Sequence, residues 1–235
     1  MIPLKDDVPS RSTPFVTVGL IAANVLAFLY QLSLEMTPTG MGPAEAFVFE
    51  FGAIPCRLTG GCMMATPDDF PHPFLTIFTS MFLHGGLFHV GGNMLYLWIF
   101  GDNVEDTLGH GRFLLFYLVS GVAAAAAQTL ANPRSTVPMI GASGAVSGVL
   151  GAYLVLFPYA TILTLITFGF FIRFVHIPAM IVLGFWVVLQ FINGFISYGA
   201  RGGEGGGVAW FAHIGGFVAG VILLFLVRPR RTARL

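Results

Sequence analysis

Six long apolar runs, joined by shorter polar segments, dominate this sequence. A helix needs about 20 mostly apolar residues to cross a bilayer, so each run predicts a transmembrane helix. The expected spans cover residues 15–34, 87–101, 113–131, 145–160, 177–196 and 208–227. The second and fourth are short and contain polar side chains, which a helix tolerates inside a bundle rather than against lipid. No run shows the alternation of a transmembrane barrel. The sequence therefore predicts an all-α, polytopic membrane protein with a bundle of six transmembrane helices.

The scarcity of charge supports a membrane location. Only 9% of the residues are charged and 56% are hydrophobic, whereas a soluble domain carries about 25% charged and 45–50% apolar residues. This balance excludes an ordinary cytosolic enzyme, a nucleic-acid-binding protein and a disordered chain. We therefore expect the lipid bilayer as the environment and no nucleic-acid partner.

The distribution of basic residues predicts how the chain crosses the membrane. With both ends inside, eight of the eleven Lys and Arg residues fall in cytoplasmic segments and three in outer segments, as the positive-inside rule favours. We expect a short cytoplasmic N-terminus at residues 1–13, a membrane domain at residues 14–228 and a basic cytoplasmic tail at residues 229–235. The first run is too long and lies too late to be a secretory signal. These features predict a multi-pass protein of the cell (inner) membrane.

The longest polar-containing stretch, residues 35–82, is then an extracytoplasmic loop between the first two spans. It contains both cysteines, Cys56 and Cys62, with five residues between them. Two thiols this close on the oxidising side of a membrane are candidates for a disulfide bond, although two unpaired thiols fit the spacing equally well. Two sulfurs without a nearby histidine pair do not favour a zinc site, and neither a metal nor a cofactor is expected.

Polar side chains within hydrocarbon cost free energy unless they are paired, so each one is a candidate functional residue. His89 and Asn93 are four residues apart and therefore lie on one face of the second helix. His84 precedes a pair of glycines and is expected at the end of the loop. Two convergent hydrogen-bond donors could stabilise a developing negative charge. The alternative is that both bond the backbone of a neighbouring helix.

The fourth span opens with small residues at every fourth position, Ser143 and Ser147, beside a second row with Gly144 and Gly148. Such rows commonly indicate close helix–helix packing in which the small residues have no catalytic role. Ser143, however, follows Gly141 and should lie at the N-terminus of this helix, where unpaired N–H groups and the positive end of the helix dipole gather. A serine hydroxyl there lies beside an anion site of the kind that acyl transfer requires.

The sixth span carries His213 three residues before Gly216 and seven before Gly220, so the three share one stripe. Glycines on that stripe allow a close approach to the small-residue face of the fourth span, which would bring the imidazole of His213 to the hydroxyl of Ser143. A lone histidine in a span is more often a packing or proton-relay residue. Here, however, the glycine stripe that carries His213 matches the small-residue stripe that carries Ser143. This match favours Ser143 as a nucleophile and His213 as its general base.

The sequence lacks the residues that other types of hydrolytic site would require. No carboxylate lies in the outer half of any expected span, so a Ser–His dyad is expected rather than a triad. The chain has no HExxH motif of a zinc protease. Asp102 has no second intramembrane aspartate with which to form an aspartyl pair.

These segments resemble the motifs of the rhomboid family of intramembrane serine proteases. The chain carries HxxxxHxxxN at His84, His89 and Asn93, GxSG over Gly141–Gly144, and AHxxGxxxG over Ala212–Gly220. The motifs occur in the family's order, on spans two, four and six. The resemblance covers residues 13–227.

The resemblance implies a protease that cuts single-span membrane proteins in or near their transmembrane segments, without a cofactor. Ser143 would be the nucleophile and His213 the base. The side chains of His89 and Asn93, with the backbone N–H of Ser143, would form an oxyanion hole, and His84 would help to hold the first loop. Gate or cavity-lining positions of the family fall on three residues of the fifth span: Trp186, Gln190 and Phe191.

The chain departs from the family at two places. A Trp-Arg pair that some bacterial members carry in the first loop is replaced by Leu75 and Thr76. The aromatic residue that many members carry four positions after the serine, where it packs on the catalytic histidine, is replaced by Ser147. Neither departure touches the dyad itself.

Two interpretations from other classes stay open. A catalytically silent relative that binds and escorts membrane clients would typically lack the serine or the histidine, and both are present here. A small transporter would use midplane ions or broken helices and usually internal repeats, and the sequence contains no repeat. An active protease whose partners are transmembrane substrates is therefore the favoured interpretation.

Overall fold

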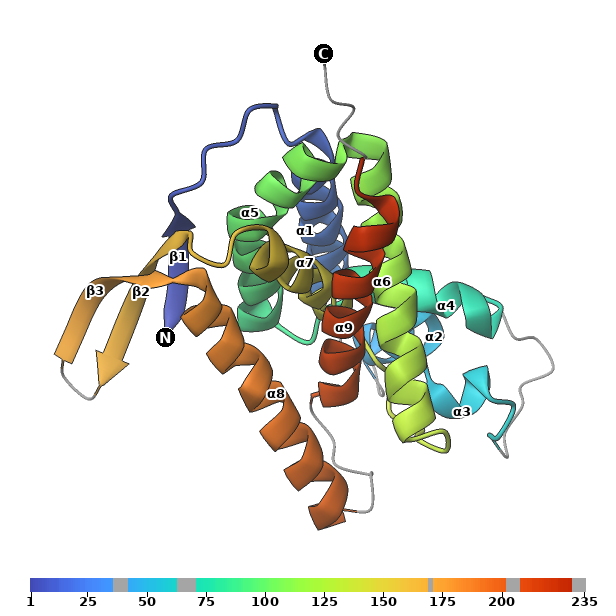
Figure 1. Ribbon diagram of the computed structural model, residues 1–235. Helices are drawn as coiled ribbons and strands as arrows, with labels where there is room; N and C mark the ends of the chain where they lie inside the picture. The colour runs from blue at the N-terminus through green and yellow to red at the C-terminus, as the bar shows by residue number, and fades with distance from the viewer. Residues whose placement is uncertain (36–41, 63–70, 169–170, 202–207, 230–235) are drawn as a thin grey trace.

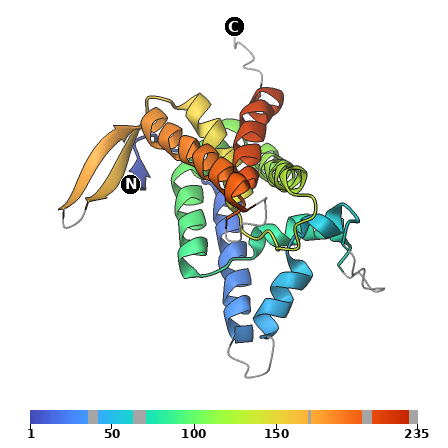
Figure 2. The same cartoon turned by 90° about the horizontal axis from the view of Figure 1, so that it is seen from below.

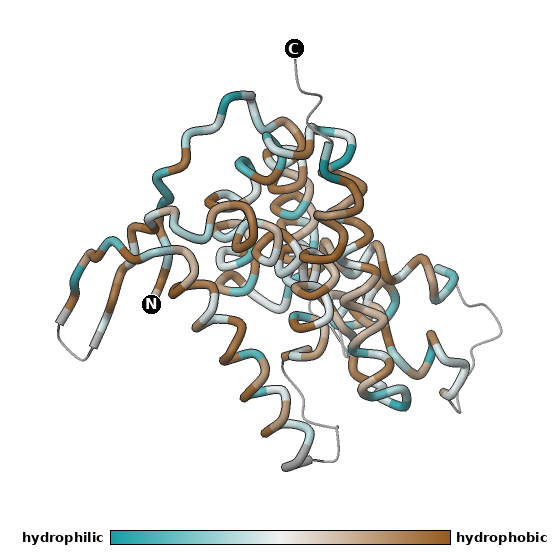
Figure 3. The backbone as a smooth tube through the Cα atoms, viewed as in Figure 1, coloured by the Kyte–Doolittle hydropathy of each residue, from teal (hydrophilic) through white to brown (hydrophobic). Residues whose placement is uncertain are grey.

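The computed structural model describes residues 1–35, 42–62, 71–168, 171–201 and 208–229. Six helices of 14 to 23 residues form the body of this described part (Figure 1). They are α1 (Phe15–Glu35), α5 (Leu87–Leu108), α6 (His110–Ala131), α7 (Ser143–Leu156), α8 (Ala179–Arg201) and α9 (Trp210–Val227). Apolar residues cover most of their length (Figure 3). The predicted class, a helical membrane bundle, is confirmed.

Length and hydropathy identify four of these helices as candidate membrane spans: α1, α6, α8 and α9. The helix α5 passes the same test only together with the segment Pro73–Phe82, from which it is bent by 83°. The predicted helices all exist, but this criterion supports four or five spans rather than six. The chain is a multi-pass membrane protein.

The short helix α7 lies at the centre of the bundle, packed against α5, α6 and α9 (Figure 1). Every residue of Gly144–Tyr153 is buried. With 14 residues, α7 is shorter than the roughly 20 that cross hydrocarbon, so its neighbours rather than lipid cover it. It ends at Leu156 rather than at the predicted residue 160, because the following Pro158 disfavours helical geometry at Phe157.

The second predicted span was too short at its C-terminal end. The helix α5 continues past Gly101 to Leu108 because its charged residues are used inside the fold. Glu105 is fully buried, and its carboxylate accepts hydrogen bonds from the backbone N–H groups of Val16 and Thr17 at 2.9 and 2.7 Å. These N–H groups belong to the first turn of α1 and lack partners within that helix. Glu105 therefore caps α1 and ties it to α5.

A three-stranded antiparallel sheet, which the sequence analysis did not predict, projects sideways from the bundle (Figures 1 and 2). Its strands are β1 (Ile2–Asp6), β2 (Thr161–Phe168) and β3 (Phe171–Pro178), in the order β1-β2-β3. The fifth predicted span, which was to start at residue 177, begins at Ala179 because the preceding residues pair with β2. An apolar run of eight residues is short enough to be a strand. Here β2 pairs with β1 on one side and with β3 on the other.

The N-terminal segment, predicted only as a short cytoplasmic stretch, is thus an ordered strand. Ile2 of β1 pairs with Leu165 of β2. The hydroxyl of Tyr153, at the end of α7, donates a 2.6 Å hydrogen bond to Asp6, and Asp7 accepts one of 2.7 Å from the backbone N–H of Thr161. These contacts fix the sheet to the bundle.

Asp6 makes the stability of this junction depend on pH. Burial, the largest cause, raises the pKa of Asp6, the charge of Asp102 raises it further, and the Tyr153 hydrogen bond opposes both. A carboxyl whose pKa is raised in the folded state favours folding below its unfolded pKa, and this contribution is lost as the pH rises through the folded pKa. We expect Asp6→Asn to raise the Tm at pH 7 by at most about 2 °C, since the group is half-exposed. The difference from the wild type should vanish near pH 4 in thermal unfolding scans, and a gain that persists there would contradict this explanation.

The connection between α1 and α5 folds into short helices rather than a plain loop. They are α2 (Pro43–Phe51), α3 (Pro55–Leu58), α4 (Pro73–Thr79) and the 3₁₀ turn η1 (Ser80–Phe82). Proline occupies the first turn of each α-helix, where its fixed φ and missing N–H favour helix initiation. Residues 36–41 and 63–70 of the predicted loop, and residues 230–235 of the predicted basic tail, lie outside the described residues.

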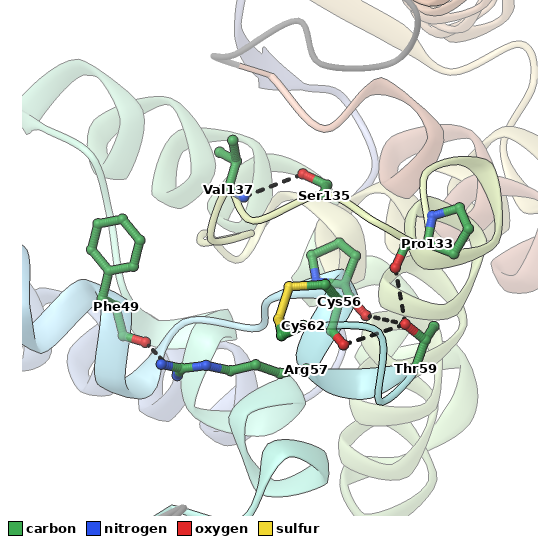
Figure 4. The surroundings of a disulfide bond; sticks show 9 residues. Phe49, Cys56, Arg57, Thr59, Cys62, Pro133, Ser135 and Val137 are labelled. Atoms are coloured by element: carbon green, nitrogen blue, oxygen red, sulfur yellow. Dashed lines mark hydrogen bonds between the residues drawn. A yellow bond between two sulfur atoms is a disulfide. The ribbon is translucent and has the colours of Figure 1, made fainter. Parts of the chain in front are cut away.

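A disulfide bond joins Cys56 and Cys62 and closes a turn at the end of α3 (Figure 4). This turn lies on the connection between α6 and α7. The backbone N–H of Cys56 donates to the carbonyl of Ser135 at 3.0 Å, and the hydroxyl of Thr59 donates to the carbonyl of Pro133 at 2.9 Å. The disulfide-bonded segment therefore supports the connection that leads into Ser143.

Candidate active site

The helices α7 and α9 approach each other so closely that only glycine fits between them. A Cβ atom added to Gly216 would lie 2.0 Å from the carbonyl oxygen of Gly144, and one added to Gly220 would lie 2.1 Å from that of Gly148. Small-residue rows allow backbones to come together in this way. The glycine stripe of α9 thus packs on the small-residue face of α7, and this contact sets the spacing of the side chains at its end.

Ser143 and His213 meet at that end. Ser143 is the first residue of α7, and His213 lies in the first turn of α9. The Oγ atom of Ser143 lies 2.8 Å from Nε2 of His213, which is hydrogen-bond distance. The residue before the helix, Ala142, provides no side-chain cap, so the first N–H groups of α7 are left for other acceptors.

The His213 ring is held from α8 as well. Its Nδ1 atom lies 2.8 Å from Oε1 of Gln190, which is 6% exposed. The ring centroid of Trp186, one turn earlier on α8, lies 6.0 Å away with the planes tilted by 38°, and Trp210 contacts the ring edge-on at 6.2 Å. The sequence analysis noted Gln190 but missed this contact; the one available signal was an amide in an otherwise apolar run.

His89 and Asn93 lie on one face of α5 and border Gly141. A Cβ atom added to Gly141 would lie 2.7 Å from Nε2 of His89 and 3.6 Å from Nδ2 of Asn93. The Nδ1 atom of His89 accepts a 3.3 Å hydrogen bond from the backbone N–H of Gly85, so the proton of the neutral ring lies on Nε2. The Nδ2 group of Asn93 is buried without a hydrogen-bond partner among the described residues. Two donors without acceptors therefore point to one small space.

His84 lies apart from this arrangement, between η1 and α5, as the glycines after it predicted. It is 2% exposed, and its ring meets that of His89 edge-on at 5.1 Å. Its backbone N–H donates to the side chain of Gln31 at 2.9 Å, and its carbonyl accepts from the same amide at 3.2 Å. His84 thus links the start of α5 to α1 and packs behind His89.

A cavity of about 530 Å³ opens over these groups. Its polar side chains include those of Ser143, His213, His89 and Asn93, and most of the remaining wall is apolar. The volume lies within the range of about 300–1,000 Å³ that is typical of ligand-binding clefts. Among the described residues, no group of three or more His, Cys, Asp and Glu side chains is placed to hold a metal ion.

Comparison with known proteins gives the family. The family model of the Rhomboid domain matches residues 71–230, more than half of the chain. This chain belongs to the rhomboid family. It is 29% identical over 232 residues to RHOMBOID-like protein 1 of Arabidopsis thaliana, covering 92% of this chain and 54% of that protein.

Two bacterial relatives carry the word protease in their names. The chain is 44% identical over 78 residues to the rhomboid protease GluP of Bacillus subtilis, covering 33% of this chain and 15% of GluP. It is 30% identical over 159 residues to the putative rhomboid protease YdcA of the same organism, covering 67% and 69%. The chain thus spans about half the length of the plant relative and a small part of GluP.

The structure describes the residues at the two departures from other rhomboid members. Thr76 is 2% exposed on α4, and its hydroxyl bonds the carbonyl of Pro73 at 2.6 Å, while Leu75 is exposed. Ser147 turns its hydroxyl to the carbonyl of Ser143 at 2.6 Å. The aromatic contacts of the His213 ring come from Trp186 and Trp210.

The three residues of α8 that the rhomboid resemblance singled out differ in their contacts and exposure. Trp186 lines the cavity. Gln190 bonds His213. Phe191 is 40% exposed and does not line the cavity.

Proposed function

We propose that this rhomboid-family chain is an intramembrane serine endopeptidase that cleaves transmembrane segments of single-span membrane proteins. The observation that carries the proposal is the 2.8 Å contact between the Ser143 hydroxyl and the His213 imidazole in the wall of a cavity within a helical membrane bundle. A nucleophile hydrogen-bonded to a base is the signature of covalent acyl transfer. Polar groups at membrane depth are costly and are retained for function.

In the proposed reaction, Oγ of Ser143 attacks the carbonyl carbon of the scissile peptide bond while Nε2 of His213 takes the hydroxyl proton. The tetrahedral intermediate places negative charge on the former carbonyl oxygen. The intermediate collapses when the C–N bond breaks and His213 gives the proton to the leaving amine. Water, deprotonated by the same imidazole, then hydrolyses the acyl-enzyme and restores Ser143.

The oxyanion requires donors in position before the charge develops. Nε2–H of His89, the Nδ2 group of Asn93 and the backbone N–H of Ser143 supply them. The two side-chain donors border Gly141 without an acceptor of their own, which supports this role. A helical peptide bond is shielded by its own hydrogen bonds, so substrates should carry small or helix-weakening residues at the cleaved segment.

The proposed location is the cell membrane, with both chain ends in the cytoplasm. The site then opens on the outer side, because Glu105, near the end of α5, bonds the first turn of α1, whereas His89 and Asn93 lie near the start of α5. The oxidising outer side also suits the disulfide between Cys56 and Cys62.

The proposal is tested with purified protein and a fluorogenic transmembrane peptide in liposomes. Wild type and Ser33→Ala, which changes an exposed serine on α1, should cleave the peptide, and Ser143→Ala should reduce cleavage to background. Cleavage that survives Ser143→Ala would reject the nucleophile. Wild-type protein that binds the peptide without cutting it would favour a client-binding relative.

Asn93→Ala tests the oxyanion donors separately. Because this donor acts mainly on the transition state, kcat should fall about 100-fold while KM changes little. Steady-state kinetics at several peptide concentrations separate the two constants. A rise in KM with an unchanged kcat would assign Asn93 to ground-state binding instead.

A further inference from the structure

A third side chain completes the hydrogen-bonded chain at His213. We propose that Gln190 is a positioning residue that holds His213 in the one neutral tautomer able to accept the proton of Ser143. This inference rests on the proposed function and adds to it a residue on α8. It stands on two distances, 2.8 Å from Gln190 Oε1 to His213 Nδ1 and 3.2 Å from Gln190 Nε2 to the carbonyl of Trp186.

The backbone carbonyl of Trp186 fixes the orientation of the Gln190 amide. A carbonyl oxygen can only accept a hydrogen bond, so the group that faces it must be the NH₂ of the amide. The amide oxygen then has to face His213. Because Gln190 is 6% exposed, water does not compete for either end of the amide.

The amide orientation in turn fixes the tautomer of His213. An oxygen that faces Nδ1 requires a proton on Nδ1, since two acceptors at 2.8 Å would repel each other. A neutral ring that carries its proton on Nδ1 has a lone pair on Nε2. The Ser143 hydroxyl, 2.8 Å from Nε2, can then donate its proton to that lone pair. In the other tautomer Nε2 would carry a proton and could not act as the base.

An amide suits this position better than a carboxylate would. Serine proteases in water orient the equivalent imidazole with a buried carboxylate, but an ionised side chain at membrane depth is costly. Gln190 supplies an acceptor oxygen without charge. Since Gln190 lies on α8, the tautomer of His213 depends on α8 lying against α9.

The first test compares two substitutions of similar size. Gln190→Met removes the acceptor and keeps an unbranched side chain, while Gln190→Glu keeps an oxygen in either protonation state. We expect Gln190→Met to lower kcat about 10- to 100-fold with little change in KM. Gln190→Glu should restore most of the wild-type kcat. Val188→Met, at an exposed position of the same helix, is the matched control and should leave kcat unchanged.

The second test reads the tautomer directly and does not need activity. In protein labelled with ¹⁵N-histidine, the His213 signals are those absent from a His213→Gln sample. We expect the proton on Nδ1 in wild type and in Gln190→Glu, and a population with the proton on Nε2 in Gln190→Met. If wild-type protein cleaves no peptide, the proposed function fails, and this spectrum still decides the role of Gln190.

Three results would overturn the inference. One is a wild-type ring with its proton on Nε2. Another is a Gln190→Met variant that keeps both wild-type kcat and the Nδ1–H signal. The third is an equal loss of kcat and of Tm in Gln190→Met and Gln190→Glu, which would mean that Gln190 only packs the helices.

Discussion

Replacing His213 by Gln is expected to lower kcat/KM by about 10⁴-fold or more, with the fold preserved. Gln still offers a hydrogen bond to Ser143 but cannot take its proton, and the members of a nucleophile–base unit fail together when either is lost. The side chain contacts Ser143, Gln190 and the rings of Trp186 and Trp210. None of these contacts belongs to the glycine stripe between α7 and α9. The glycine contacts that hold those helices are therefore left intact.

The measurement is peptide cleavage in liposomes beside thermal unfolding of the same samples. His176→Gln, an exposed histidine on β3, provides the same substitution away from the site and should cleave at the wild-type rate. Cleavage by His213→Gln within about tenfold of wild type would mean that another group deprotonates Ser143, because a general base contributes at least about 10²-fold.

Gly141→Ala is expected to lower kcat about 10²- to 10³-fold by closing the proposed oxyanion hole. The added methyl would lie 2.7 Å from Nε2 of His89 and 3.6 Å from Nδ2 of Asn93, in the space where the oxyanion would bind. Gly141 also has a φ of +117°, which side-chain-bearing residues rarely adopt. Its N–H donates to the carbonyl of Ser80 at 2.9 Å, so the backbone cannot move aside without losing that bond.

Gly109→Ala is the control that separates the effect of backbone strain from the effect of a methyl group placed in the proposed oxyanion hole. Gly109 has a φ of +80°, and a Cβ atom there would meet no atom within 4 Å. It should lower the Tm through backbone strain alone and leave kcat unchanged. A Gly141→Ala protein with wild-type kcat would place the oxyanion elsewhere, and an equal loss of kcat in Gly109→Ala would attribute the effect to strain.

The helices could be predicted from the sequence because long apolar runs are stable in lipid only as helices. The polar residues His89, Asn93, Ser143 and His213 could be singled out for the same reason, since each is costly in a span unless it has a partner. Helix periodicity then matched the glycine stripe of α9 to the small face of α7. That match is what brings the last two residues to 2.8 Å.

The features that could not be predicted depend on contacts between segments far apart in the chain. Residues 161–178 are as apolar as a span, but β2 pairs with β1 at the N-terminus and with β3, and this pairing makes both segments strands. The second expected span ended at residue 101, before Glu105, but this buried side chain accepts hydrogen bonds from the first turn of α1 and lies within α5, which continues to Leu108. Gln190 on α8 contacts His213 on α9. The spacing of residues along one helix does not predict a contact between two helices.

The most direct measurement of the central claim is covalent labelling of wild-type protein in liposomes with a fluorophosphonate, followed by peptide mapping. The probe reacts with serine hydroxyls that a neighbouring base activates. We predict a single adduct on Ser143 that forms at the same rate in Ser33→Ala and is lost in His213→Gln. An unlabelled Ser143, or labelling that proceeds equally fast without His213, would contradict the assignment of these two residues as nucleophile and base.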